Sequence, residues 1–152
     1  MTTFQVSMII EKPIDIVVEA LMNPHNFVYW TAHLEKFEVI QGKPGEVGSI
    51  AHLHYSQKGK TYVMEDKLVS CTPGEKYISE VTGDFLVAKV ETTLISSGDR
   101  TEMILQWKGK GKTLFLKILL PLLRGRISRN AKKDLETFKF LLETRGSDFN
   151  NE

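Results

Sequence analysis

The fold is decided by the last long apolar stretch of the chain, residues 113–145, which read TLFLKILLPLLRGRISRNAKKDLETFKFLLETR. This stretch contains the densest run of large aliphatic side chains, and we interpret it as one kinked C-terminal helix. In its second half, apolar residues recur at intervals of four, four, three and four, which puts them on one face of the helix. The residues of this stripe are Ile127, Ala131, Leu135, Phe138 and Leu142. We expect the stripe to clamp the helix onto the core.

The first half of this helix is apolar on nearly every side. Its core-facing side continues the stripe through Leu116, Leu120 and Leu123. The side chains on the opposite side are Phe115, Ile118 and Leu122. Leaving each of them in water forgoes on the order of 1.5–3 kcal/mol of burial. We therefore expect this face to meet a ligand, a second subunit, a membrane or another part of the chain.

Pro121 divides the two halves. It has no N–H to donate to the carbonyl of Lys117, so we predict a kink or break at this point. Residues 113–123 would then form a movable flap that is hinged near Pro121.

Positive charge is concentrated around this flap. Residues 103–133 contain nine Lys or Arg and no acidic residue, so the rest of a chain with net charge +1 carries −8. Apolar side chains flanked by basic ones are typical of helices on anionic lipid. We consider four roles: a solvated basic face with a locally packed flap, a membrane contact through Lys117, Arg124 and Arg126, a homodimer through the outward side chains, and nucleic-acid binding. Nucleic acid is disfavoured because few aromatic residues interleave with the basic ones and the pI is only about 7.8.

The chain before this helix is mostly strands separated by turns that contain glycine. Residues 3–10 place apolar side chains at every second position, which predicts a half-buried strand. Pro13 and the apolar spacing after it predict a short helix that ends at Asn23-Pro24, and a second short helix is expected over residues 24–30. The six strands expected next cover residues 34–41, 48–56, 60–71, 76–81, 85–95 and 100–108. Their short connections favour antiparallel pairing.

Several local patterns accompany this order of elements. They are Phe4-x-Val6 before Ile10-x-x-Pro13, Trp30 near the end of the second short helix, Gly45-x-x-Gly48, and Asp134-Leu135-x-x-Phe138-Lys139. Order and patterns together resemble the START-like, polyketide-cyclase-like (SRPBCC) superfamily over nearly the whole chain. The resemblance implies an α+β helix-grip fold: a curved, seven-stranded antiparallel sheet, two short helices after the first strand, and a long kinked C-terminal helix over a hydrophobic cavity. Because members range from cyclases and aromatases to lipid carriers and co-chaperones, it specifies the fold much better than the activity.

Length and composition are those of an ordinary globular domain. A chain of 152 residues can bury ~68–70% of its unfolded surface in a single core. We expect this domain to cover residues 1–147 and the tail at 148–152 to be disordered. Cys71 is the only cysteine and has no placed base, so we expect a structural thiol, and the N-terminus lacks the features of a signal peptide. The expected location is cytoplasmic.

Strand alternation assigns one set of side chains to the face that meets the helices. The candidates for lining a ligand cavity are Trp30, Tyr62, Met64, Leu86, Ala88, Val90, Thr92, Met103, Leu105, Trp107, Leu116, Leu120 and Ile127. Tyr62, Thr92 and Trp107 are best suited to orient a ligand, because such cavities are mostly apolar with a few polar groups. The alternative is that these side chains fill a solid core. His33 is expected to be a loop residue or to lie at the cavity mouth.

No catalytic or metal-binding set is evident in the sequence. His52 and His54 share one side of a strand, but a third metal ligand is missing unless Glu65 lies across a hairpin. We therefore expect a solvent-facing pair of histidines, no metal and no other cofactor. Glu65 and Asp66 must point to opposite faces, and we expect both to be solvated or paired with lysine. The alternative is an inward carboxyl with a raised pKa.

These observations predict binding or transport of a hydrophobic small molecule or lipid in an internal cavity, and they favour a protein that is not an enzyme. One alternative is an enzyme of the polyketide cyclase or aromatase type, which would hold a flexible chain in a reactive shape. That alternative requires a carboxyl with a raised pKa, or a histidine, directed into the cavity. A further alternative is a lipid carrier that docks on a membrane surface.

Overall fold

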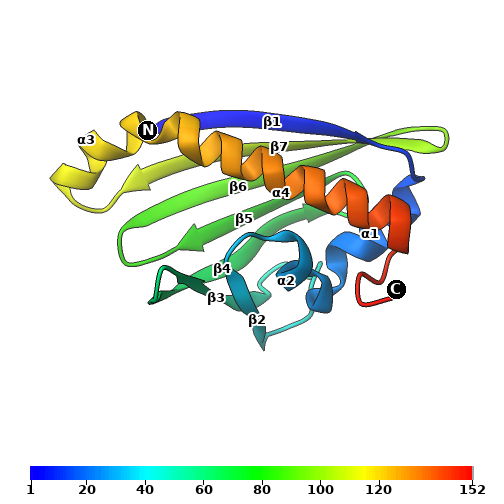
Figure 1. Ribbon diagram of the computed structural model, residues 1–152, viewed down its shortest axis with the longest axis horizontal. Coiled ribbons are helices and arrows are strands. Elements are labelled where there is room, and N and C mark those ends of the chain that lie inside the picture. Colours follow the sequence, from blue (N-terminus) through cyan, green and yellow to red (C-terminus); the bar gives the residue numbers. More distant parts are fainter. Residues whose placement is uncertain (152) are drawn as a thin grey trace.

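The computed structural model describes residues 1–151 and shows one curved antiparallel sheet with a long helix lying across it (Figure 1). The elements are β1 (Thr2–Ile10), α1 (Ile14–Met22), η1 (Pro24–Asn26), α2 (Phe27–Trp30), β2 (Leu34–Gln41), β3 (Ile50–Gln57), β4 (Lys60–Thr72), β5 (Lys76–Thr82), β6 (Leu86–Ser97), β7 (Arg100–Gly111), α3 (Leu114–Leu122) and α4 (Arg124–Arg145). The seven strands follow the order β1-β7-β6-β5-β4-β3-β2. The predicted α+β helix-grip architecture is confirmed.

Strand β1 closes one edge of the sheet by pairing with β7, although about a hundred residues separate them in sequence. Its alternation decides which side faces inward. Phe4, Val6 and Ile10 are buried, whereas Gln5 is exposed. A strand with one apolar face has only one register that buries that face, so β1 is fixed by its own pattern.

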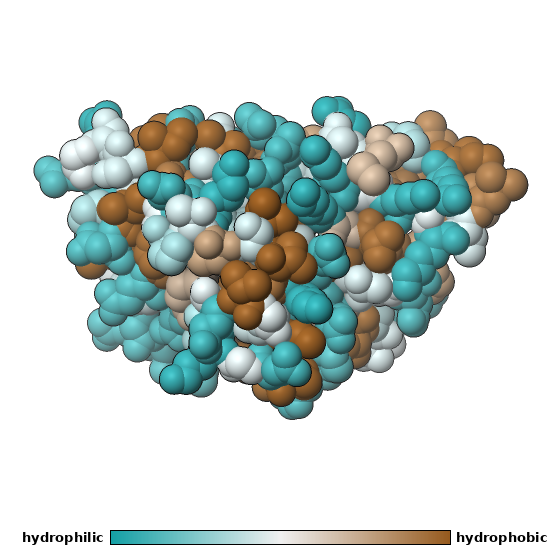
Figure 2. All heavy atoms as spheres, turned by 180° about the vertical axis from the view of Figure 1, so that it is seen from behind, coloured by the Kyte–Doolittle hydropathy of each residue, from teal (hydrophilic) through white to brown (hydrophobic). Residues whose placement is uncertain are grey.

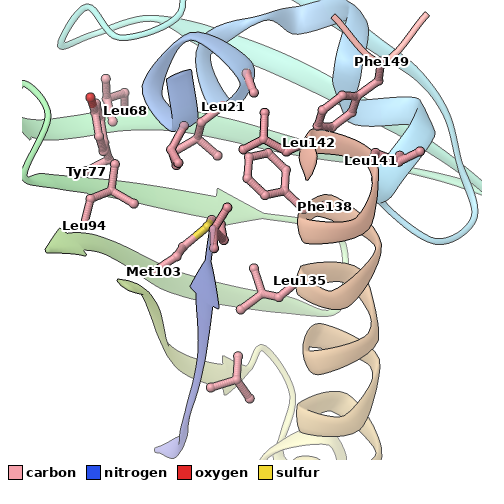
Figure 3. Close-up of a cluster of buried hydrophobic side chains, with 14 of the residues drawn as sticks. Leu21, Leu68, Tyr77, Leu94, Met103, Leu135, Phe138, Leu141, Leu142 and Phe149 are labelled. Atoms are coloured by element: carbon pink, nitrogen blue, oxygen red, sulfur yellow. The ribbon is translucent and has the colours of Figure 1, made fainter. Parts of the chain in front are cut away.

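Helix α4 holds the core through the predicted stripe. Leu135, Phe138 and Leu142 are almost completely buried, and Figure 3 shows them extending from α4 toward the sheet and α1. The Phe138 ring packs edge-on against Trp30 of α2, with ring centroids 5.1 Å apart. Burying a side chain of this size contributes about 1.5–3 kcal/mol. The second half of the C-terminal helix is therefore the clamp that its spacing predicts.

The end of the chain is part of this core, which corrects the expectation of a disordered tail at 148–152. Phe149 is fully buried and its ring lies edge-on to Phe138, at a centroid distance of 5.5 Å. Its backbone N–H donates to Oδ1 of Asn26 at 2.9 Å. The Asn26 amide in turn donates to the carbonyls of Ala20, at 2.9 Å, and of Ser147, at 2.8 Å. The structure does not describe residue 152, so the expectation is tested only up to residue 151.

The predicted interruption near Pro121 is a complete break between two helices. Helix α3 ends at Leu122, and Leu123 has φ −92° and ψ −1°, outside the α-helical values. Its N–H turns back tightly to the carbonyl of Leu120, at 3.0 Å. Pro121 itself lies inside α3, where its missing N–H leaves the carbonyl of Lys117 without its usual backbone donor, and the break follows two residues later. Thr113 caps the start of α3, because its hydroxyl accepts the N–H of Leu116 at 3.2 Å.

Candidate ligand cavity

A cavity of about 490 Å³ lies between the inner face of the sheet and helices α1, α2 and α4. Its volume falls in the range of ordinary small-molecule sites, about 300–1,000 Å³. The cavity is partly open to solvent. Two of its lining side chains, Val39 of β2 and Tyr62 of β4, are among the exposed large hydrophobic residues. The mouth of the cavity therefore lies near these two side chains, on the part of the sheet formed by β4, β3 and β2.

The structure brings eleven of the thirteen predicted lining residues to this cavity. They are Trp30, Tyr62, Met64, Leu86, Ala88, Val90, Thr92, Met103, Leu105, Trp107 and Ile127. The other two, Leu116 and Leu120, belong to α3, which packs against β7 instead. The contact is close, because a Cβ added at Gly111 would lie 2.4 Å from the carbonyl carbon of Leu116. The spacing of Leu116 and Leu120 correctly predicts which side of α3 faces the sheet. Because the helix breaks after Pro121, however, that side packs on β7 and not on the cavity.

Two aromatic rings from neighbouring strands form part of the cavity wall. Phe4 of β1 and Trp107 of β7 are stacked, with centroids 5.2 Å apart and an interplanar angle of 18°. The indole of Trp107 lies across the backbone at Gly109, where an added Cβ would come within 2.0 Å of the ring. Only glycine leaves room for the ring in this position. This packing explains the glycine at 109 in the Gly109-Lys110-Gly111 segment.

Two carboxyl groups also line the cavity. Asp66 of β4 and Asp134 of α4 are both half-buried lining residues. The expectation that Asp66 is solvated or paired with lysine is therefore wrong. The signal for its true position was present, since Asp66 has the same strand parity as the inward residues Tyr62 and Met64. Glu65 points to the outer face, as strand geometry requires.

Burial shifts the titration of both carboxyls. It raises the pKa of Asp66, and a hydrogen bond with Ser79 partly opposes this shift. Burial also raises the pKa of Asp134 from 3.8 to about 6. The backbone N–H of Ala32, which donates to Oδ1 of Asp134 at 3.2 Å, and the nearby charge of His33 oppose that shift. An Asp with a raised pKa binds its proton more tightly in the folded protein, so its contribution to stability is greatest below about pH 4 and is lost as the pH rises through about 6.

Two tyrosines lie near the two carboxyls, and together these four residues form the polar end of the cavity. Tyr55 and Tyr62 are paired across β3 and β4 and stack at 5.0 Å with an interplanar angle of 10°. Burial raises the pKa of both, and the negative charges of Tyr62, Asp134 and Asp66 raise that of Tyr55 further. Tyr55 was not among the predicted lining residues, although its alternation with His54 pointed to the inner face. Among the lining residues of the described chain there is no Lys, Arg or His, so this end of the cavity is rich in hydrogen-bond acceptors.

Comparison with known proteins identifies the architecture but not the activity. No protein-family model and no curated protein match the sequence. Three solved structures are similar over 90–96% of this chain. They are the Zhui aromatase/cyclase from Streptomyces sp. R1128 (TM-score 0.75, 16% identity, 94% of that chain), a conserved protein from Geobacillus kaustophilus (0.78, 14%, 97%) and a START superfamily protein from Mycobacterium smegmatis (0.72, 12%, 95%). The chain has the START-like helix-grip fold. Identities this low show a shared fold alone.

On the outer face of this START-like fold, the two histidines of β3 pair with carboxylates. His54 lies 3.0 Å from Glu38 and His52 lies 3.5 Å from Glu65, which faces it across the β3–β4 hairpin as the sequence suggested. In residues 1–151 no group of three or more His, Cys, Asp or Glu is placed to hold a metal ion. Neither His52 nor His54 is among the described residues that line the cavity.

His33 and Cys71 are the remaining candidates for chemistry in the START-like fold. His33 is exposed in the loop after α2, at a positive φ of 65°, and lies close enough to lower the pKa of Asp134. It is thus beside the cavity without lining it. Burial raises the pKa of the Cys71 thiol, which disfavours a reactive thiolate. No helix of residues 1–151 is long and apolar enough to cross a membrane.

Proposed function

We propose that this protein binds a hydrophobic small molecule or lipid in the cavity between the sheet and α4. The observation that carries the proposal is a cavity of about 490 Å³ with mostly apolar walls, between the sheet and the helices. Apolar walls bind an apolar ligand without specific contacts, because the ligand leaves water on entering. The rings of Trp107 and Phe4 offer flat surfaces against which a ring system or an acyl chain can lie.

The polar end of the cavity defines the chemistry of the ligand further. Asp66, Asp134, Tyr55 and Tyr62 gather there, and residues 1–151 contribute no basic side chain to the lining. A ligand carboxylate at this end would meet two acidic groups without a compensating cation, which is costly in a partly buried site. A hydroxyl or amine can instead donate a hydrogen bond to either carboxylate. The ligand class that fits is therefore an apolar molecule with a hydroxyl or amine at one end.

Fluorescence titration with a neutral apolar dye such as Nile red tests for a cavity of this kind. Val90 lines the cavity, whereas Val87 lies on the outer face of the same strand. Val90→Trp fills the space with an indole. We expect it to weaken dye binding by at least about tenfold, because the dye then loses an apolar contact area of roughly one buried side chain. Val87→Trp, the matched control, is expected to bind as wild type does. No saturable binding by the wild type, or equal binding by both variants, would refute the proposal.

Competition against the bound dye then tests the polar end. A long-chain alcohol or amine is expected to displace the dye at lower concentration than the carboxylate of the same chain length. Asp66→Asn combined with Asp134→Asn should remove most of that preference. If the carboxylate competes best, the assignment of an acceptor-rich end is wrong even though dye binding itself stands.

A second function is favoured by the same two carboxyls. Burial raises the pKa of Asp66 and raises that of Asp134 to about 6, which makes both carboxyls candidates for proton transfer. A cyclase or aromatase would need such groups, and the Zhui aromatase/cyclase is one of the proteins that share this fold. In an aldol cyclisation, one carboxylate would accept a proton from the carbon between two carbonyls. The new carbon–carbon bond would form at a third carbonyl, whose oxygen would take a proton from the other carboxyl.

Product analysis distinguishes this reaction from simple binding. The protein is incubated with a linear poly-β-ketone thioester, and the cyclised products are compared with those that form without protein. A cyclase would change the product distribution, and Asp66→Asn and Asp134→Asn would each restore the spontaneous one. An unchanged distribution with wild-type protein would leave ligand binding as the function and exclude this second one.

A further inference from the structure

Helix α3 leaves a row of large apolar side chains uncovered. The exposed fractions are 76% for Leu114, 71% for Phe115, 64% for Ile118 and 77% for Leu122. Phe85 is 65% exposed and lies in the turn before β6, close to the start of α3: its carbonyl accepts the N–H of Lys112 at 2.8 Å. Figure 2 shows hydrophobic surface at the corner of the molecule from which α3 projects, at the upper right. We call these five residues the α3 patch.

Packing of the fold does not require the α3 patch to be apolar. The opposite side of α3 is anchored on β7, where Leu120 is buried and the backbone of Leu116 lies against Gly111. Helix α3 is thus held in place by one side while its other side remains in water. Contiguous exposed apolar surface of this kind is typical of an interaction site rather than of a free protein surface.

The surroundings of the α3 patch are basic. Five exposed basic residues belong to this part of the chain: Lys110 on β7, Lys112 in the connection between β7 and α3, Lys117 on α3, and Arg124 and Arg126 at the start of α4. Within residues 1–151 none of them takes part in an ion pair, although the Arg124 guanidinium donates to the carbonyl of Thr3 at 2.6 Å. Exposed basic residues therefore precede α3, lie within it and follow it, and in the part of the chain that the structure describes none of the five is paired with a carboxylate.

We propose that the α3 patch docks this protein onto an anionic lipid bilayer. The apolar side chains would enter the boundary between headgroups and acyl chains, while the Lys and Arg side chains would meet anionic headgroups. A second copy of the chain fits less well, because a two-fold contact brings the same basic surroundings face to face. The proposal goes beyond ligand binding and stands whether or not the cavity is occupied.

Cosedimentation of the full-length protein with lipid vesicles tests this docking. Vesicles of phosphatidylcholine alone are compared with vesicles that also contain phosphatidylserine, at low and at high salt. The expected result is binding to the anionic vesicles alone, weakened on the order of tenfold at high salt because screening removes the attraction to the headgroups. Equal binding to both kinds of vesicle, or no binding to either, would overturn the proposal.

Two variants and one matched control locate the contact. Phe115→Ser with Ile118→Ser is expected to weaken vesicle binding by more than about tenfold, because two side chains no longer leave water. Lys117→Glu with Arg126→Glu should abolish the preference for anionic lipid. Phe140→Ser changes an equally exposed phenylalanine near the other end of α4 (63% exposed) and should have no effect.

The same variants expose the competing explanation. Analytical ultracentrifugation in the absence of lipid is expected to give a monomer for wild type and for Phe115→Ser with Ile118→Ser. A wild-type dimer that this double variant dissociates would assign the α3 patch to a second copy and overturn the membrane proposal. Vesicle binding that is unchanged in both double variants would do the same.

Discussion

Replacing Phe138 with alanine removes the side chain through which α4 contacts α2 and the C-terminal turn. Phe138 is fully buried and packs edge-on against Trp30 and Phe149, at 5.1 and 5.5 Å. Truncating a buried phenylalanine to alanine costs about 3–5 kcal/mol, from lost transfer free energy and the cavity left behind. Because two aromatic pairs are lost together, we expect a value near the upper end, about 5 kcal/mol. That is a large part of the 5–15 kcal/mol by which domains are ordinarily stable.

Urea unfolding followed by circular dichroism measures this loss. The midpoint should fall with an unchanged slope, and a chain of this length should melt about 10–20 °C lower. Phe140→Ala is the matched control, because Phe140 lies on the same helix but is 63% exposed; its effect should stay within about 0.5 kcal/mol. A loss below about 2 kcal/mol for Phe138→Ala, or equal losses for the two variants, would show that α4 is not held on the core in the way described.

Three further predictions concern the cavity and its support. Asp134→Asn should stabilise the protein near pH 7 and not at pH 4: the full shift in pKa from 3.8 to about 6 corresponds to roughly 3 kcal/mol, which partial exposure reduces to about 1–2 kcal/mol. Urea unfolding at both pH values measures this, and an equal effect at both would contradict it. Gly109→Ala should cost about 1–3 kcal/mol and change tryptophan fluorescence, because its Cβ would lie 2.0 Å from the Trp107 ring. Gly125→Ala in α4 should instead stabilise by up to about 1 kcal/mol, because its Cβ would meet only the end of the Arg129 side chain, at 3.4 Å. The same sign for both glycines would refute this reasoning. Asn26→Ala should lower the free energy of unfolding by about 2–4 kcal/mol, because three buried or half-buried backbone groups lose their hydrogen-bond partner. Thermal unfolding measures this loss, and a value under about 1 kcal/mol would mean that water replaces the amide.

The parts of the fold that local periodicity encodes were predictable from the sequence. The alternation of β1 and the stripe of α4 each state directly which side is buried, and both assignments are confirmed. The strand order follows from short turns that join successive strands, with one long-range pairing added between β1 and β7. The family resemblance rested on these same features, which explains why it predicted architecture and not activity.

The features that the sequence did not predict depend on contacts between distant segments. Phe149 follows the end of α4 without any periodic pattern, and only its meeting with Asn26 and Phe138 shows that it is buried. Leu120 faces β7 rather than the cavity because the chain turns at Leu123, and the angle of that turn is set by tertiary packing. Asp66 differs from its prediction for another reason: a carboxylate is usually solvated, but the parity of β4 directs this one into the cavity.

Native mass spectrometry of the freshly purified protein tests the central claim, that the cavity holds an apolar ligand, most directly. We expect a species heavier than the polypeptide by one small organic molecule. Solvent extraction should release this molecule, and its mass spectrum should show an apolar compound with a hydroxyl or amine group. This species should be absent from Val90→Trp and present in Val87→Trp. If wild-type protein carries no such adduct and takes up none from a mixture of hydrophobic alcohols and amines, the cavity does not hold a ligand of this class.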